Sequence, residues 1–500
     1  MRRIAGLSRT QPLKKPAAKV RTAPPKNAAK AEARRAGARK AAQKGRAPQL
    51  YCSDLIARLF KGYAAEEIKI WGDRYPAYLR ANLQPVIEEL FMASGDQCVG
   101  AVPRYGSQDL GMNELMSRDP HERIAAGPVS YVAVDTGEDQ PVRCVRNALI
   151  LRRTPMPHAI FIYVRTDPGG EARHVDVDIA VPRDHPGSEV FAAKCLAPLE
   201  EAIEQCHAYR GKVLSLENQE HYSGRVGRIQ VHRLKPVEAS EVILPAPTRK
   251  LLDRCVIDFM KARGPLRAMG FQTKRGILLY GPPGTGKTHT IRYLAGNLPG
   301  TTTLLITAEQ VGLLPHYMSL ARLLQPAMVV IEDVDLIARS RDRMRSACDE
   351  TMLNGLLNEM DGLKENSDIL FILTTNRPQD LEAALANRPG RIDQAIEVPV
   401  PDTPSREKLV RLYARGMKLP DKLAAEAVKR TEGVSAAFVK ELMRRTAQAA
   451  IAREDGAKKV VEPPARGGVQ PTEADLSEAL DDMLFAGGKL NATLLGGAAG

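Results

Sequence analysis

Three apolar runs in the middle of the chain share one feature, since each stops abruptly at a polar or glycine-rich segment. They are Gly276–Tyr280, Met328–Ile331 and Ile369–Leu373. Short continuous apolar runs bounded by turn residues are typical of strands that are buried on both faces, as in a parallel sheet. We therefore predict buried strands whose carboxyl ends carry the polar chemistry of the chain.

The region before these runs, residues 48–240, has a different pattern. Apolar runs at Ala148–Leu151 and Ala159–Val164 flank a proline-containing turn, and apolar and polar residues alternate from His174 to Val181. Such alternation has the period of a strand with one buried face. The remaining segments predict a helix over 189–208 and a strand over 226–234. We expect a mixed α/β domain of unknown role, and we recognise no known module in it.

One group in this region has the residue types of a metal site. His174, Asp176 and Asp178 would lie on the same face of the predicted strand. A metal site needs further ligands, which nothing nearby in the sequence supplies. We therefore interpret these side chains as the polar outer face of a half-buried strand.

Helical patterns follow the third apolar run. Thr403 is a candidate N-cap with Pro404 at the first helical position, and Ser435 is a candidate N-cap for a helix with an apolar stripe. That stripe consists of Phe438, Val439, Leu442 and Met443. Residues 457–500 predict a linker, a short helix opened by a Thr472–Asp475 capping box, and a flexible Gly/Ala-rich end.

Charge changes the interpretation of the N-terminus. Residues 1–47 hold 15 Lys and Arg against one acid, Glu32, whereas the other 453 residues carry a net charge of −1. So basic and apolar-poor a stretch predicts a disordered tail. Three roles remain open for it: a solubilising tail, a tether to nucleic acid or another acidic surface, and a transit peptide.

Cysteine usage and hydropathy restrict the compartment. Seven cysteines are scattered without a C-x-x-C pair, which argues against a disulfide framework and a cysteine zinc site. No apolar run approaches the roughly 20 residues that a spanning helix needs. We expect a soluble cytoplasmic protein with no membrane span.

The first buried strand leads into a phosphate-binding pattern. Gly281-Pro282-Pro283-Gly284-Thr285-Gly286-Lys287-Thr288 matches G-x-x-x-x-G-K-[ST], and His289 follows it in the predicted helix. The glycines allow backbone N–H groups to point at phosphates, and the helix N-terminus adds its positive end. We expect these nine residues to bind ATP, with Lys287 at the β- and γ-phosphates and the Thr288 hydroxyl on Mg²⁺.

Polar residues follow the other two buried strands. Glu332 and Asp333 end the second strand, where carboxylates can hold the metal and orient a water. Asn376 follows the third strand and can bond an attacking water or the γ-phosphate. Arg388 and Arg391 place two guanidiniums, the side chains best suited to phosphate, three residues apart.

Together these elements resemble the AAA family of ATPases, in its classical clade. The resemblance runs from about Val242 to Gly456 and includes motifs on both sides of the nucleotide-binding core. They are Gly281–Thr288, Val329–Asp333, Leu356–Gly362, Thr375–Pro378, Arg388–Asp393, Val398–Asp402 and Gly433–Phe438.

The resemblance implies an α/β fold, in which a doubly wound parallel sheet (241–398) carries a small helical lid (399–456). It also implies ATP bound at the subunit interfaces of a homo-oligomeric ring, usually a hexamer. By position, Glu332 would take the metal role with Thr288, Asp333 would activate water, and Asn376 would orient it. Arg388 and Arg391 would act as arginine fingers in a neighbour's site.

Three departures from the family pattern matter. The family usually has Asp then Glu where this chain has Glu332 then Asp333, an order similar to that of mitochondrial cytochrome bc-complex assembly ATPases. The aromatic-x-Gly pore loop is absent after the Leu304–Thr307 strand, so Leu313 or Tyr317 would have to substitute for it. No H-E-x-x-H motif exists, which argues against a membrane AAA protease.

We therefore expect an ATPase that couples Mg-ATP hydrolysis to the remodelling or assembly of a protein client chosen by residues 48–240. Two alternatives remain. One is a nucleic-acid-associated ATPase recruited by the basic tail, and the other is an ATP-gated scaffold with little turnover.

Overall fold

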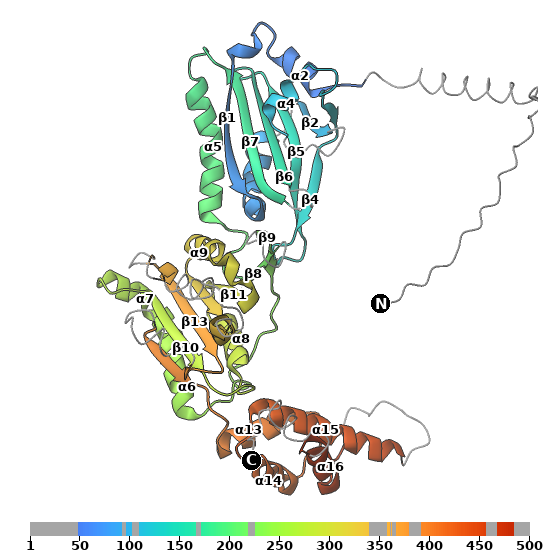
Figure 1. The fold of residues 1–500 in the computed structure, drawn as a ribbon, viewed down its shortest axis with the longest axis vertical. Helices are drawn as coiled ribbons and strands as arrows, with labels where there is room; N and C mark the ends of the chain where they lie inside the picture. The colour runs from blue at the N-terminus through green and yellow to red at the C-terminus, as the bar shows by residue number, and fades with distance from the viewer. Residues whose placement is uncertain are drawn as a thin grey trace, which may run out of the picture. The chain divides into compact units, whose positions relative to one another are not determined.

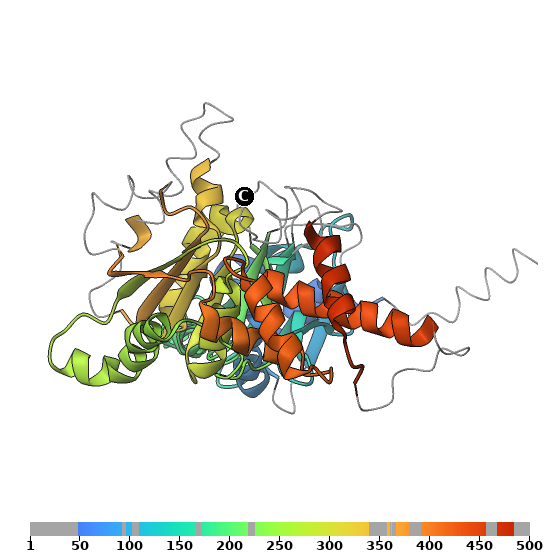
Figure 2. The same ribbon diagram turned by 90° about the horizontal axis from the view of Figure 1, so that it is seen from below.

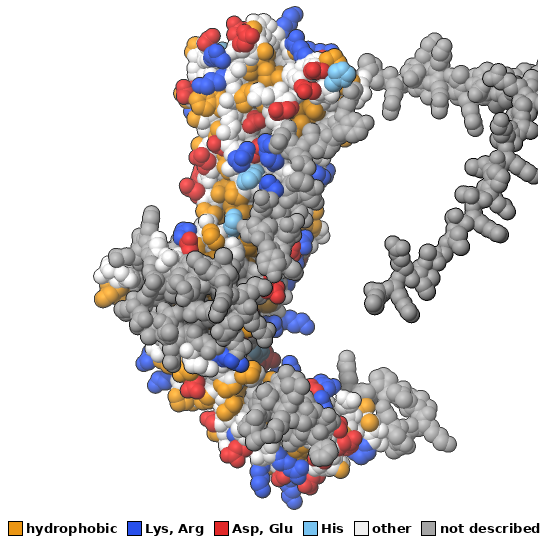
Figure 3. Space-filling view, viewed as in Figure 1, with side chains coloured by type: hydrophobic (Ala, Val, Ile, Leu, Met, Phe, Trp, Pro, Cys, Tyr) orange, Lys and Arg blue, Asp and Glu red, His pale blue; other side chains and the backbone are white. Residues whose placement is uncertain are grey.

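The computed structural model describes residues 49–92, 97–102, 110–166, 172–218, 226–339, 358–360, 362, 367–379, 392–456 and 468–484. The predicted disordered tail, residues 1–47, and the predicted flexible end after residue 484 lie outside these ranges. No helix of the described residues is long and apolar enough to cross a membrane. Figure 3 shows Lys, Arg, Asp and Glu side chains interspersed over the visible face, in keeping with a near-neutral body.

The first part of the described chain is built on an antiparallel sheet of seven strands in the order β1-β7-β6-β5-β2-β3, with β4 paired to β5 (Figure 1). The strands are β1 (Ile68–Pro76), β2 (Gln97–Val102), β3 (Ala125–Gly127), β4 (Ser130–Val134), β5 (Val142–Arg152), β6 (His158–Thr166) and β7 (Ala172–Pro182). The helices are α2 (Cys52–Leu59), η1 (Ala65–Glu67), η2 (Ala77–Leu79), α3 (Arg80–Val86), η3 (Ile87–Phe91), α4 (Met112–Met116) and α5 (Ser188–Gln205). The predicted helix over 189–208 corresponds to α5.

Both faces of this sheet are covered, which corrects the prediction of a half-exposed strand over 174–181. Val175, Val177 and Ile179 of β7 pack into a core with α3 and α5. On the opposite face Ala180 packs into a second core with residues of α2 and α4. The alternation correctly predicts a strand, but among its polar positions Asp176 is buried and His174 and Asp178 are only partly exposed.

The second sheet has the order β14-β10-β13-β12-β11-β8-β9. Its strands are β8 (Val213–Asn218), β9 (Val226–Val231), β10 (Arg275–Tyr280), β11 (Thr302–Ile306), β12 (Ala327–Ile331), β13 (Ile369–Thr375) and β14 (Gln394–Glu397). All are parallel except β9, which is antiparallel to β8. The helices around it are α6 (Ala246–Leu252), η4 (Asp253–Asp258), α7 (Phe259–Ala268), α8 (Lys287–Asn297), η5 (Ala308–Leu313), α9 (Leu314–Leu323) and α10 (Val334–Arg339). The three predicted buried strands are β10, β12 and β13, and they are adjacent.

The sheet begins earlier in the chain than the expected boundary at residue 241. Strands β8 and β9 belong to the stretch assigned to the N-terminal domain, yet β8 pairs with β11 through Val213 and Leu214. Beyond Leu214, side chains replace the backbone ladder. The Leu216 N–H donates to the Tyr317 hydroxyl at 2.7 Å, and the Leu216 carbonyl accepts from Gln310 Nε2 at 2.9 Å. A polar clamp of Tyr317 and Gln310 therefore fixes the added strand to the edge of the sheet.

Helices of residues 403–484 form a separate apolar cluster, drawn in orange to red in Figure 2. They are α13 (Thr403–Tyr413), α14 (Asp421–Arg430), α15 (Ala436–Gly456) and α16 (Glu473–Leu484). Leu476, Ala479, Leu480 and Met483 of α16 pack with this cluster, so the predicted C-terminal helix is part of the lid. Asp402, not Thr403, caps α13, because its carboxylate accepts the Ser405 N–H at 2.9 Å. Ser435 caps α15 and Thr472 caps α16 as predicted.

Candidate nucleotide-binding site

Three loops meet at the carboxyl ends of adjacent parallel strands. The glycine-rich loop 281–286 follows β10, the carboxylates Glu332 and Asp333 follow β12, and Asn376 follows β13. Since β13 lies between β10 and β12 in the sheet, all three loops lie at one edge. Ligands of open α/β sheets bind in such a crevice.

The glycine-rich loop needs glycine at two positions for reasons of space and backbone. Gly281 has a φ of 149°, and a Cβ there would lie 2.2 Å from the Val398 carbonyl oxygen. Gly284 has a φ of 76°, and its Cβ would lie 2.9 Å from that of Ala437. The loop is thus pressed between the end of β14 and the start of α15, and it leads into α8 at Lys287. It has the form of a phosphate cradle at a helix N-terminus.

Lys287 is buried at the base of this loop, with 8% of its surface exposed. Its Nζ donates to the carbonyls of Gly281 at 2.7 Å and Pro282 at 2.9 Å. Burial lowers the pKa of Lys287, and the negative charges of Asp333 and Asp335 oppose that shift. The ammonium therefore lies within the field of the carboxylates that follow β12.

The two predicted carboxylates have different surroundings. Oε1 of Glu332 is buried and has no hydrogen-bond partner among the described residues. Asp333 lines the cavity next to the loop and has a φ of 51°, a left-handed conformation that Asp and Asn tolerate better than most residues. Its backbone N–H donates to Thr374 Oγ1 at 3.0 Å. Asp333 thus presents its carboxylate to the cavity.

Asn376 completes the group. Its Nδ2 donates to Asp333 Oδ1 at 3.1 Å, and both side chains line the same cavity. An amide in contact with a carboxylate can hold that side chain in one orientation toward the cavity. The structure therefore brings together Lys287, Asp333 and Asn376, which the sequence analysis had selected from three separate motifs.

The cavity has a volume of about 690 Å³, within the range of small-molecule sites. Its polar side is formed by residues 283–290 with Asp333 and Asn376, and its apolar side by Val242, Ile243, Leu409 and neighbouring residues. His289 lies on its rim, with Nε2 3.3 Å from the Glu241 carbonyl oxygen. The lid contacts the glycine-rich loop directly, because the Ala437 N–H donates to the Gly284 carbonyl at 3.0 Å.

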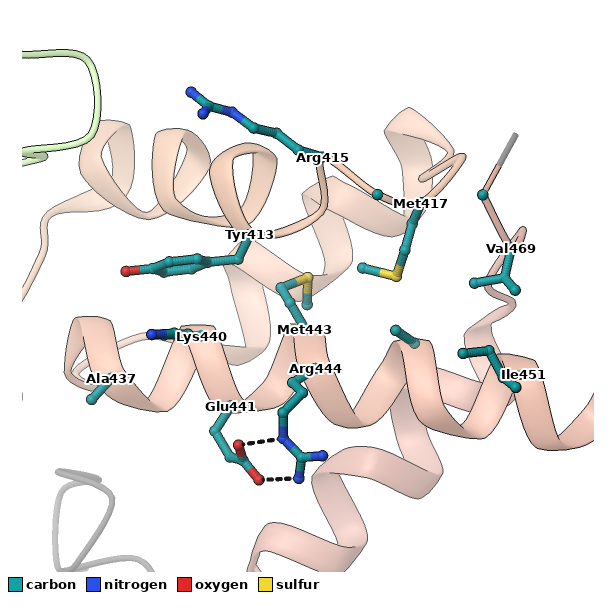
Figure 4. Close-up of a pocket in the computed structure, with 13 residues that line it drawn as sticks. Tyr413, Arg415, Met417, Ala437, Lys440, Glu441, Met443, Arg444, Ile451 and Val469 are labelled. Atoms are coloured by element: carbon teal, nitrogen blue, oxygen red, sulfur yellow. Dashed lines mark hydrogen bonds and ion pairs between the residues drawn. The ribbon is translucent and has the colours of Figure 1, made fainter. Parts of the chain in front are cut away.

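A second cavity of about 810 Å³ lies within the lid, along α15 (Figure 4). Met417, Met443, Ile451 and Val469 give it an apolar lining, and Glu441 and Arg444 form a two-bond ion pair at its side. That pair, together with Arg445, lowers the pKa of Glu441 to about 2. This cavity has no glycine-rich loop, so it offers no phosphate-binding chemistry.

The residues at the first cavity fit a nucleotide-bound Mg²⁺. No group of three or more His, Cys, Asp or Glu side chains that could hold a metal ion occurs in the described ranges. Mg²⁺ does not require one, because it keeps several waters and binds through one or two carboxylates together with phosphate oxygens. The Thr288 hydroxyl belongs to a residue that lines the cavity. Glu332 does not line it, but it directly precedes the lining residue Asp333, and its unpartnered oxygen suits that ligand set.

Sequence reasoning missed several residues of this site. Asp335 is buried and accepts a hydrogen bond from the backbone N–H of Asn376. In the sequence it is the third carboxylate of Glu-Asp-Val-Asp, and this pattern could have indicated it. Arg292, Arg415 and Lys440 also line the cavity, but no local pattern distinguishes them from ordinary helix-surface cations. The predicted Arg388 and Arg391 fall in the stretch 380–391, outside the described residues.

Two expectations about other residues have a clear outcome. Leu313 and Tyr317 cannot substitute for an aromatic pore loop, because both side chains are fully buried and Tyr317 forms the clamp on β8. In β7, Asp176 pairs with Arg74 at 3.1 Å and Arg165 at 2.8 Å, and Asp178 accepts the Met112 N–H. These carboxylates serve the packing of the sheet.

Comparison with known proteins identifies the class of this site. The family model described as ATPase family associated with various cellular activities (AAA) matches residues 277–400. This match includes the glycine-rich loop, both carboxylates and Asn376. The chain therefore contains an AAA ATPase domain.

Similar curated proteins match 40–46% of the chain. An ATP-dependent zinc metalloprotease FtsH of Mycoplasmopsis synoviae is 38% identical over 212 residues, which are 40% of this chain and 32% of the relative. FtsH 2 of Symbiobacterium thermophilum is 33% identical over 245 residues, 46% of this chain and 39% of the relative. FtsH 3 of Sphaerobacter thermophilus is 33% identical over 240 residues, 46% of each chain. The chain thus spans less than half the length of these relatives.

Proposed function

We propose that the protein hydrolyses ATP to ADP and phosphate in the presence of Mg²⁺ and uses the cycle to remodel or assemble a protein partner. The observation that carries the proposal is the contact between Asn376 and Asp333 in a cavity whose other wall is the glycine-rich loop. A phosphate cradle facing a carboxylate held by an amide is the arrangement that positions water for phosphoryl transfer.

The proposed roles follow from the positions of the side chains. The loop and the N-terminus of α8 hold the phosphates, and the Lys287 ammonium neutralises charge on them. Thr288 and Glu332 would hold Mg²⁺, which would supply positive charge at the phosphates. Asp333 accepts a hydrogen bond from the attacking water, and Asn376 orients the carboxylate and that water. Arg388 and Arg391 are proposed to reach a neighbouring subunit's site in a ring, usually a hexamer.

The lid is suited to respond to the nucleotide. Its helix α15 contacts the loop through Ala437 and Gly284, and its apolar residues Leu409 and Leu412 form part of the wall of the same cavity. An apolar wall of this kind fits the flat base of ATP. Filling and emptying the cavity would therefore shift the lid against the sheet, which supplies a movement that a partner can use.

A protein partner is the best-supported target. The relatives are named as ATP-dependent zinc metalloproteases, which supports a target that is itself a protein. The protease part is not proposed here, because the sequence has no H-E-x-x-H motif. We propose that the N-terminal sheet domain selects the partner. The Glu332-Asp333 order supports a finer assignment to the cytochrome bc-complex assembly group, on that feature alone.

Phosphate release by the purified full chain tests the proposal. We expect turnover that increases with protein concentration as rings assemble, and a loss of about 100-fold or more in Lys287→Ala. Lys429→Ala, an exposed lysine of the lid, is the matched control and should retain wild-type turnover. Wild-type turnover in Lys287→Ala would contradict the assignment. Tight ATP binding with negligible wild-type turnover would instead support the ATP-gated scaffold.

A further inference from the structure

Asp335 is a buried carboxylate that the roles above do not use. It lies in the first turn of α10, 3% exposed, and it is not among the residues that line the nucleotide cavity. Burial of a carboxylate is costly unless its oxygens are hydrogen-bonded. The hydrogen bonds that Asp335 accepts therefore indicate its role in the structure.

Within the described part of the chain, the hydrogen bonds of Asp335 go to residues at the end of the neighbouring strand β13. Its Oδ1 accepts the Thr375 hydroxyl at 2.8 Å and the Asn376 backbone N–H at 3.2 Å. Thr375 Oγ1 in turn accepts the Arg377 N–H at 2.9 Å. One carboxylate oxygen thus fixes the backbone on both sides of Asn376.

These bonds close a ring of contacts between the ends of β12 and β13. Asn376 donates to Asp333 Oδ1 at 3.1 Å, and the Asp333 N–H donates to Thr374 Oγ1 at 3.0 Å. Asp335 follows Asp333 by two residues, so the same short turn bonds both the backbone and the side chain of Asn376. A shift of Asn376 would therefore move its amide away from Asp333.

We propose that Asp335 is a positioning residue for ATP turnover, which holds the Asn376 amide against Asp333 without touching the nucleotide. The inference rests on the proposed ATPase function. Displacement of a reacting group by about 1 Å can cost on the order of 100-fold in rate. The contribution of Asp335 should therefore appear in kcat, while ATP binding depends on the loop and is largely spared.

Two substitutions at this position separate its bonding from its charge. Asp335→Ala removes the acceptor and should lower kcat about tenfold or more, with KM for ATP changed less than about threefold. Asp335→Asn keeps an oxygen at the Oδ1 position and should recover kcat to within about threefold of wild type. A KM increase without a kcat decrease, or unchanged kcat in Asp335→Ala, would overturn the inference.

A second pair guards against misfolding of Asp335→Ala. Thr375→Val removes the hydroxyl donor and Thr375→Ser restores it, so kcat should fall in the first variant and recover in the second. Equal kcat in both Thr375 variants would overturn the positioning role even if Asp335→Ala does not fold. Absence of turnover in the wild type would overturn the ATPase function itself, whereas an active wild type with fully active variants would overturn the positioning role alone.

Discussion

Carboxylates in the two sheets of this chain have opposite kinds of neighbours. In the antiparallel sheet, Asp176 of β7 is neutralised by two guanidiniums, from Arg74 and Arg165. In the parallel sheet, Asp333 contacts the neutral amide of Asn376, and one oxygen of Glu332 has no partner in the described part of the chain. Asp176, matched by two cations, serves the packing of its sheet, whereas Asp333, which contacts a neutral amide and lines a cavity, keeps its charge available for a ligand.

The difference comes from the position of the residues along their strands. Asp176 lies in the middle of β7, where its neighbours are side chains of adjacent strands and packed helices. Glu332 and Asp333 lie just past the end of β12, where the chain turns into α10 and the sheet edge opens on a cavity. The middle of a strand thus favours structural ion pairs, whereas the carboxyl end of a parallel strand favours ligand binding.

Replacement of Asp333 gives the largest expected effect. In Asp333→Asn, the amide keeps an oxygen for Asn376 and tolerates the left-handed backbone, but it cannot accept a proton. We expect phosphate release to fall by about 100- to 10,000-fold, with ATP binding and stability retained. Glu309→Gln, at an exposed carboxylate, should keep wild-type turnover. Turnover within threefold of wild type in Asp333→Asn would remove Asp333 from the chemistry.

Replacement of Asp176 should have the opposite profile. Asp176→Asn leaves Arg74, which is exposed, and Arg165, which is partly exposed, without their shared acceptor charge, so we expect the free energy of unfolding to fall by about 1.5–3 kcal/mol. Turnover per folded molecule should be unchanged. Urea unfolding beside phosphate release measures both, with the exposed Asp184→Asn as control. A variant as stable as the control would show that this ion pair does not hold the sheet together.

The sequence predicts these differences only where the interacting residues belong to recognisable local patterns, and not where they lie far apart along the chain. The glycine-rich loop, the carboxylates and Asn376 each follow an apolar strand, so local pattern is sufficient to predict that they meet. Arg74 lies 102 residues from Asp176, and no local pattern links the two. His-Val-Asp-Val-Asp and Glu-Asp-Val-Asp look alike as strings. Only the tertiary neighbours show that Asp176 of the first motif pairs with two arginines and that Asp333 of the second lines a cavity.

The antiparallel pair of strands β8 and β9 shows that the fold, too, depends on contacts between distant segments. Strand β9 was predicted, but its sheet was not, because strand pairing is decided by contacts between distant segments. Its neighbour β8 joins β11 through two residue pairs, and the clamp of Tyr317 and Gln310 continues the attachment. Tyr317 appears in the sequence as a candidate for an exposed pore residue. Its burial follows from β8, which covers the edge on which such a loop would begin.

Removal of the Tyr317 hydroxyl should have a moderate effect confined to this edge. Tyr317→Phe leaves the buried Leu216 N–H without its acceptor, which costs about 1–3 kcal/mol of unfolding free energy. Because Tyr317 does not line the nucleotide cavity, the affinity for ATP should remain at the wild-type value. Tyr63→Phe, at an exposed tyrosine, is the control for stability. Equal stability of the two variants would show that the clamp is dispensable.

The smallest expected effect concerns Asp178, the other strand carboxylate of β7. Burial raises its pKa, and the bond from the Met112 N–H opposes that shift. Gly72 on β1 makes room for it, since a Cβ there would lie 2.5 Å from Asp178 Oδ1. The folded protein therefore holds this proton more tightly than the unfolded chain does. Its contribution to stability is full below the ordinary pKa of Asp and is lost as pH rises through the raised pKa.

Asp178→Asn should consequently flatten the decline of stability with rising pH, because the amide cannot ionise and still accepts the Met112 N–H. Unfolding midpoints measured between about pH 3 and 7 test this, with Asp184→Asn as the exposed control. Parallel pH profiles for wild type and Asp178→Asn would contradict the raised pKa. A flatter dependence of stability on pH in Asp178→Asn would support the contrast between the two sheets. Ionised Asp178 destabilises the sheet in which it is buried, whereas Asp333 lines a cavity where its charge can meet a ligand.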